Sequence, residues 1–216
     1  FPPFRRAGPF GWVFACSLVA WLTHGPLDSC TTYGTELLWP FDPARVAWNN
    51  VGIIDPLYTG ILAAGLWASG RLHRSGRVGR GWRVAVVAMI ASLGYLGLGV
   101  VQRERVRAAA AAAMEARGHR PTELLAAPTP LNNVLWRVVA RLEDGGWATG
   151  IARAGPSEVD VRLQPRLSDS RPPDADRWIE GSRGLSIFNH FTSGWLRWVA
   201  PGEDGRWRVV DMRYVG

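Results

Sequence analysis

Three apolar segments dominate the first hundred residues of the chain, and each holds only one charged or histidine side chain. They are residues 10–27, 51–70 and 82–101. About 17–25 helical residues cross a hydrocarbon core of roughly 30 Å, so each segment predicts a membrane-spanning helix. The alternative, three buried helices of a soluble protein, fits less well because tryptophans flank the segments where membrane interfaces are expected. These are Trp39, Trp48 and Trp82.

The residues that follow the third segment change in character. Residues 102–117 are rich in arginine and alanine, and Gly118 is a natural helix end. We therefore expect the third helix to continue out of the membrane. Pro121, Pro128 and Pro130 then predict a linker.

From residue 135 onward the apolar positions recur with a period of two, which is typical of strands. The pattern predicts a small antiparallel sheet of about five strands, with a loop at residues 168–176 and six tryptophans that belong to its core. The predicted strands are residues 136–142, 147–153, 159–163, 194–199 and 207–214. The expected fold is α+β overall, with a membrane α-helical domain over residues 1–120 and a small antiparallel β domain over residues 121–216.

The arginines predict an orientation in the membrane. Residues 71–83 hold five arginines and no acid, and short basic loops stay on the cytoplasmic side. Arg5 and Arg6 agree with this placement. Residues 28–50 hold three acids and one arginine, so we expect this loop and the C-terminal domain on the outer side. The three arginines within residues 103–107 oppose that assignment but are outnumbered.

Charge and cysteine content exclude two other classes. The net charge is +7, but five of the positive charges lie in the single loop just described, and the other arginines alternate with acids and apolar residues. We therefore predict no nucleic-acid partner. The two cysteines, Cys16 and Cys30, would lie about 21 Å apart on a helix, which is too far for a disulfide.

A polar cluster at the end of the first apolar segment carries the candidate chemistry. His24 and Asp28 are four residues apart, so a helix places them on one face, where both can ligate a divalent metal. A structural hydrogen bond between them is the alternative, and Gly25-Pro26 makes the helical geometry uncertain. Asp55 lies inside the second segment, before Pro56. It is either a functional acid or the cap of a helix.

These same residues carry a resemblance to a known family. The run from Thr23 to Phe41, THGPLDSCTTYGTELLWPF, and residues 53–59, IIDPLYT, resemble the bacterial inner-membrane metal-dependent hydrolases described as LexA-regulated or LexA-binding. The likeness continues at residues 128–139, 191–195 and 211–214. Similar proteins also carry His-Arg followed by Thr-His-Ser nearer the N-terminus. This chain begins with a phenylalanine and lacks that motif, so we expect further native sequence upstream.

The resemblance implies a membrane-bound hydrolase of the bacterial inner membrane whose metal is held by His24 and Asp28. The ligand types favour zinc. The multi-pass topology and the periplasmic C-terminal domain follow instead from the apolar segments and the arginines. The resemblance also indicates glutamine at position 36 more often than Glu36, which argues against an essential base there.

The leading hypothesis is therefore a membrane-bound metal-dependent hydrolase of unknown substrate, a phosphoester or a lipid. Asp55 would be a third ligand or the general base, and Thr31, Thr32 and Tyr33 would line the pocket. The alternative is a non-catalytic membrane protein whose β domain binds a partner. A transporter is a third hypothesis, motivated by the acid inside an apolar segment.

Overall fold

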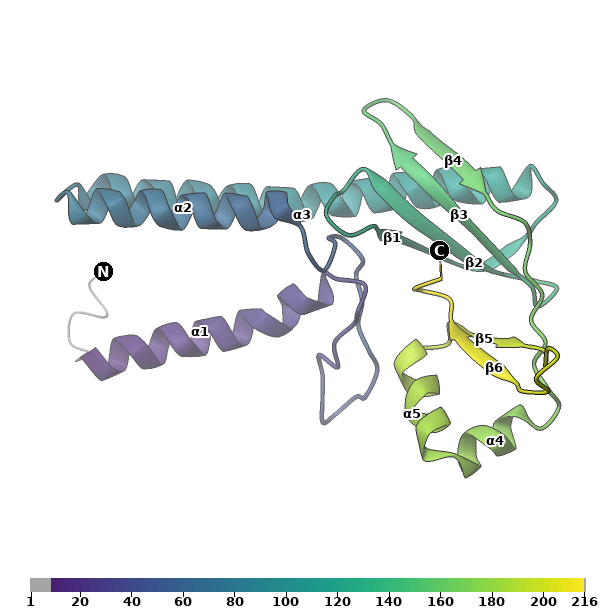
Figure 1. Cartoon of the computed structure of the whole chain (residues 1–216). Coiled ribbons are helices and arrows are strands. Elements are labelled where there is room, and N and C mark those ends of the chain that lie inside the picture. The colour runs from purple at the N-terminus through teal and green to yellow at the C-terminus, as the bar shows by residue number, and fades with distance from the viewer. Residues whose placement is uncertain (1–8, 216) are drawn as a thin grey trace.

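The computed structural model describes residues 9–215 and has a helical N-terminal half followed by a β-rich C-terminal half (Figure 1). The helices are α1 (Pro9–Ser29), α2 (Pro56–Arg74) and α3 (Val78–Glu115). This arrangement confirms the predicted α+β class. Arg5 and Arg6, which contributed to the predicted orientation, lie outside the described residues.

Within residues 9–215, two helices are long and apolar enough to cross a membrane, namely α1 and α3. The predicted second segment differs most from the structure. Residues 51–55 are irregular, and α2 begins only at Pro56, which occupies the first helical position behind the capping Asp55. α2 is not one of the two helices long and apolar enough to cross a membrane, but it packs antiparallel against α3 (Figure 1).

The surface of these helices is unusually apolar. Trp21 on α1, Leu66 and Trp67 on α2, and Ile90 and Leu93 on α3 are all exposed. α1 lies apart from the α2–α3 pair (Figure 1), and none of its apolar stretch is buried. A soluble monomer rarely exposes contiguous apolar surface on this scale, so a bilayer environment accounts for it best.

Helix α3 joins the two halves as one continuous rod of about 57 Å, from the rise of 1.5 Å per residue. Its first part pairs with α2, where Gly65 of α2 allows close contact with Ala88. Its last turns lie on the sheet, and Val106, Ala110 and Met114 are buried in the main core. The expected continuation of the third helix beyond residue 101 is therefore confirmed.

The main sheet has four antiparallel strands in the order β1-β2-β3-β4. In β2, Trp136, Val138 and Ala140 face α3, whereas Val139 faces the opposite side with Trp147 and Met212. The alternation of period two in the sequence therefore assigns the β2 side chains correctly to the two cores, one on each face of the sheet. The strands are β1 (Pro121–Pro128), β2 (Leu135–Leu142), β3 (Trp147–Ala154) and β4 (Val159–Leu163).

The predicted linker over Pro121 and Pro128 is wrong, because these residues begin and end strand β1. Proline lacks the N–H that an interior strand needs, but it is tolerated at strand ends and on edge strands. β1 is an edge strand paired only with β2, so its prolines cost no ladder hydrogen bonds to a second neighbour.

The last two strands form a separate unit instead of joining one sheet of five. β5 (Leu196–Val199) and β6 (Arg208–Asp211) make a two-stranded hairpin. Two short helices that the sequence did not indicate, α4 (Ala175–Gly181) and α5 (Arg183–Thr192), pack against it around Trp198. Trp136, Trp147 and Trp198 are fully buried, so these three are core residues as predicted.

Candidate functional site

The predicted His24–Asp28 pair forms on the last turns of α1. The helix continues through Pro26 to Ser29, and Nε2 of His24 lies 3.3 Å from Oδ2 of Asp28. The side chains are 73% and 51% exposed, so both retain free lone pairs toward the surroundings. The i, i+4 geometry that Gly25-Pro26 left in doubt is therefore present.

Asp28 also lines an open groove of about 650 Å³ beside the end of α1. The loop that follows α1 supplies most of the wall, with Tyr33 and Arg45 facing each other across a cation–π contact of 5.9 Å. The groove therefore combines carboxylates, hydroxyls and a guanidinium. Its lining residues are Asp28, Thr31, Tyr33, Gly34, Thr35, Glu36, Trp39, Arg45 and Ile53.

Of the three residues predicted to line the pocket, Thr31 and Tyr33 do so. Thr31 Oγ1 donates a hydrogen bond to the backbone carbonyl of Asp28 (2.8 Å), which fixes the turn between the helix and the groove wall. Thr32 points elsewhere. It is buried and lines a separate cavity of about 80 Å³ together with Arg213 and Tyr214.

Glu36 and Arg45 give the groove an ion-paired wall that reaches the C-terminal half. Oε1 of Glu36 lies 3.6 Å from Nη1 of Arg45 and 3.2 Å from Nε2 of His190 on α5. The guanidinium of Arg45 donates to the backbone carbonyl of Gly34 (2.7 Å). Arg45 and His190 are not among the residues that the sequence predicts. Glu36 and His190 are 154 residues apart, and no spacing pattern in the sequence connects positions so distant.

An aromatic cluster secures this contact between the two halves. Phe191 packs edge-on against Tyr33 (5.4 Å between centroids) and stacks on Tyr214. Arg213, buried in an ion pair with Asp211, donates to the backbone carbonyl of Phe191. Burial raises the pKa of the Tyr214 hydroxyl, so it stays protonated at neutral pH. The groove wall is therefore held by segments from both ends of the chain.

Asp55 occupies a capping position. Its Oδ1 accepts hydrogen bonds from the backbone N–H groups of Leu57 and Tyr58, both 3.0 Å. Its Oδ2 accepts one from the hydroxyl of Tyr95 on α3 (2.7 Å). Asp55 is only 3% exposed and is not among the residues that line the groove. The structure thus gives this carboxylate a definite structural task, and its catalytic role stays a prediction.

Within residues 9–215, no three His, Cys, Asp or Glu side chains group in a way that could hold a metal ion. Cys30, two residues after Asp28, is buried, and its burial raises the thiol pKa. The described residues thus offer two donors, one imidazole and one carboxylate, for any ion at this position.

Comparison with known proteins supports the membrane assignment. Residues 1–106 match the family model described as YdjM inner membrane protein. The YdjM match covers α1, α2 and α3 as far as Val106 and stops before the sheet. Together with the apolar α1 and α3, it supports a bacterial inner-membrane family and a location in that membrane. Its description names neither hydrolysis nor LexA. No curated protein and no solved structure matches the chain.

Proposed function

We propose that the chain is a membrane-bound metal-dependent hydrolase that acts at the groove beside the end of α1. The observation that supports this most directly is the His24–Asp28 pair, 3.3 Å apart and exposed at the border of a polar groove. The resemblance of residues 23–59 to membrane hydrolases points to the same two side chains.

The donor set suits a divalent metal such as zinc. Imidazole nitrogen and carboxylate oxygen are both zinc ligands, although a catalytic zinc usually has three protein ligands. His24 and Asp28 would therefore hold the ion together with water or with residues beyond those described. A metal bound there would lower the pKa of a bound water to about 7.

The remaining groove residues would bind and orient the substrate. Thr31 and Tyr33 supply hydroxyl groups to the wall, and the planar Arg45 guanidinium suits a pair of phosphoester oxygens. Asp55, which the sequence predicts as a third ligand or general base, has a structural role in our proposal, because it caps the N-terminus of α2. If Asp55 is also a metal ligand or the general base, Asp55→Asn loses metal or hydrolysis while the stability of the protein is kept.

We further propose a multi-pass topology with α1, α2 and α3 in the bilayer. The basic turn between α2 and α3 would lie in the cytoplasm, and the groove and the β domain on the periplasmic side. Arg103 no longer opposes this orientation strongly, because its guanidinium is engaged with the backbone carbonyl of Trp48 and with Asn50 Oδ1.

A non-catalytic membrane protein is the second candidate. The close approach of His24 to Asp28 and the three hydrogen bonds of Asp55 are also what a purely structural polar network would have. Under this alternative, His24→Ala lowers thermal stability in detergent without any loss of bound metal.

The deciding experiment is elemental analysis of the full-length protein in detergent after metal supplementation. We expect about one divalent ion per chain in the wild type and loss of that ion in His24→Ala and in Asp28→Ala. Two matched controls, His73→Ala and Asp42→Ala, change the same residue types outside the groove and should keep the ion. Absence of metal from the wild type, or retention in both site variants, would refute the proposal.

A further inference from the structure

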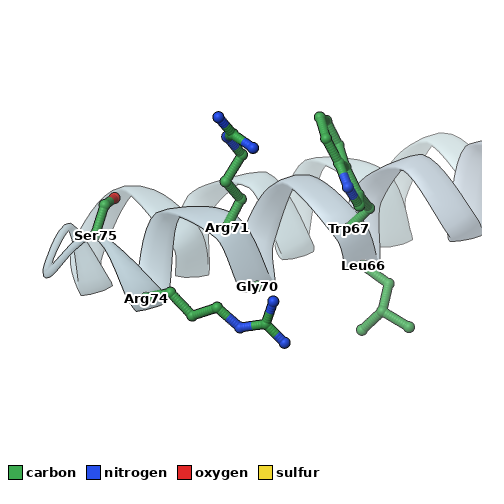
Figure 2. A pocket seen from close by; sticks show the side chains of 6 residues that line it. All are labelled: Leu66, Trp67, Gly70, Arg71, Arg74 and Ser75. Atoms are coloured by element: carbon green, nitrogen blue, oxygen red, sulfur yellow. The ribbon is translucent and has the colours of Figure 1, made fainter.

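A second feature of the membrane half lies at the opposite end of the α2–α3 hairpin, far from the groove. An open hollow of about 650 Å³ runs along the last two turns of α2. Figure 2 shows Trp67 and Arg71 on one side of the helix and Leu66 and Arg74 on the other. Gly70 lies between the two rows and leaves open space, because a Cβ added there would meet nothing within 4 Å.

The charge around this hollow is uncompensated. Residues 56–102 contain five arginines and no Asp or Glu, and within residues 9–215 none of the five makes an ion pair at or below 4.0 Å. The five are Arg71, Arg74, Arg77, Arg80 and Arg83. Like charges so placed repel one another, and an external anion would relieve that repulsion.

Helix dipoles explain only part of this cluster. Arg71 and Arg74 lie in the last turn of α2, where the dipole favours a positive charge. Arg77 and Arg80, in contrast, lie at the N-terminus of α3, where the dipole disfavours a positive charge and where the first turn has no acid. Local helix stabilisation therefore does not account for the whole cluster. The proposed cytoplasmic placement of this turn is consistent with the cluster, and an anionic partner on that side of the membrane would also compensate its charge.

The lining of the hollow indicates what kind of anion fits. Arg71, Arg74 and Ser75 lie at the helix end, and Leu66 and Trp67 lie one to two turns deeper, toward the middle of the apolar hairpin. Leu66 is 78% and Trp67 69% exposed. The guanidinium of Arg71 lies 5.8 Å from the centre of the Trp67 ring, which holds the charge at the level of an interfacial tryptophan. Basic groups at the end of α2 and apolar groups deeper in the hairpin therefore match the order of groups in a phospholipid, with its headgroup outward and its acyl chain inward.

We propose that this hollow binds an anionic phospholipid, with Arg71 and Arg74 at its phosphate and Leu66 and Trp67 along its acyl chain. Guanidinium groups recognise phosphate oxygens through paired N–H donors. Basic pockets on membrane helices select anionic headgroups in the same way. The proposal does not depend on the hydrolase activity proposed for the groove.

The test uses the full chain in detergent and native mass spectrometry with three probes. Phosphatidylglycerol is the anionic lipid, phosphatidylcholine with the same acyl chains is the zwitterionic control, and inorganic phosphate is the headgroup charge alone. We expect the wild type to retain one phosphatidylglycerol in preference to phosphatidylcholine, with little competition from phosphate.

Two variants and one matched control locate the site. Arg71→Gln/Arg74→Gln should weaken phosphatidylglycerol retention roughly 30-fold, from about fivefold for each arginine near a lipid headgroup. Gly70→Leu keeps every charge, fills the hollow and should also weaken retention several-fold. Arg80→Gln/Arg83→Gln removes the same charge from the same end of the hairpin but outside the hollow, and should weaken it less than fivefold.

Three outcomes would overturn the proposal. Equal losses in the two double variants would mean a diffuse charge effect without a site. Full competition by inorganic phosphate would mean an anion site that does not recognise lipid. Equal retention of the two lipids by the wild type would remove the headgroup selectivity on which the proposal rests.

Discussion

The buried carboxylate of Asp55 offers the sharpest test of how the membrane half is built. Asp55→Ala removes the N-cap of α2, which costs about 0.5–2 kcal/mol. It also leaves the partly buried Tyr95 hydroxyl without this acceptor, which costs about 0.5–1.5 kcal/mol. The sum is roughly 1–3.5 kcal/mol. At about 2–4 °C per kcal/mol for a chain of this size, the melting temperature should fall by roughly 2–14 °C.

Asp55→Asn separates the structural task from a catalytic one. Asparagine caps helices as well as aspartate does, and its amide group can still meet the Tyr95 hydroxyl, so the variant should lose less than about 1 kcal/mol. If Asp55 is also a metal ligand or a general base, this variant should lose metal or hydrolysis while its stability is kept. Tyr95→Phe removes only the third hydrogen bond and should cost about 0.5–1.5 kcal/mol.

Thermal unfolding of the three variants in detergent, followed by circular dichroism at the helix band, measures these differences. The reasoning is refuted if Asp55→Ala melts within about 2 °C of the wild type, because the capping contacts would then contribute little. It is equally refuted if Asp55→Asn loses as much stability as Asp55→Ala, because the negative charge itself would then be what the structure needs.

Three further predictions follow from the packing and the titrating groups. Met114→Ala, which truncates a fully buried side chain between α3 and the sheet, should cost about 2–5 kcal/mol in denaturant unfolding, whereas Met89→Ala on the exposed part of α3 should cost much less. Cys30 should react with N-ethylmaleimide far more slowly in the native protein than after denaturation, because the thiol is buried and burial raises its pKa. Peptide mass spectrometry of a time course measures the labelling of Cys30 in the two states. The backbone N–H of Gly146 and the nearby guanidinium of Arg166 lower the pKa of Asp144. The stabilising effect of Asp144 is therefore present above the unfolded pKa of about 3.9 and is lost as the pH falls through the folded pKa. Asp144→Asn should flatten the acid limb of the unfolding free energy plotted against pH, and an unchanged limb would contradict this.

Elements whose signal is local were predictable from the sequence. The three long helices follow from apolar length, and the His24–Asp28 approach follows from four-residue spacing. The two faces of β2 follow from alternation, with Trp136 on one side and Val139 on the other. Strand β1 was mistaken for a linker, because its prolines are acceptable only at a sheet edge. Edge position depends on which strands pair, and local spacing does not show pairing.

The groove was predictable only in part, for a similar reason. Asp28, Thr31 and Tyr33 belong to one short stretch and were found together. Contacts made across the fold were not. The pairing of Glu36 with His190 and the packing of Tyr33 against Phe191 join residues more than 150 positions apart. Thr32, adjacent in sequence to two groove residues, is turned away by the irregular backbone after α1, and the sequence gives no strand or helix period from which to read its direction.

The way the groove is anchored bears on which substrate class is more consistent with the structure. On one side, Arg103 of α3 holds the loop at Trp48 and Asn50, and on the other, Tyr214 donates to the backbone carbonyl of Thr32. Because α3 continues from the apolar hairpin into the sheet, these contacts fix the groove at one height beside the apolar helices. Trp39 lines the groove and is 69% exposed, and Phe41 beside it is 94% exposed. Large exposed aromatic side chains at this level are typical of a membrane interface. A lipid would reach His24 and Asp28 by moving along that interface, whereas a soluble phosphoester would have to approach past these apolar rings. Under the proposed function, these exposed aromatic side chains are therefore more consistent with a lipid substrate than with a soluble phosphoester.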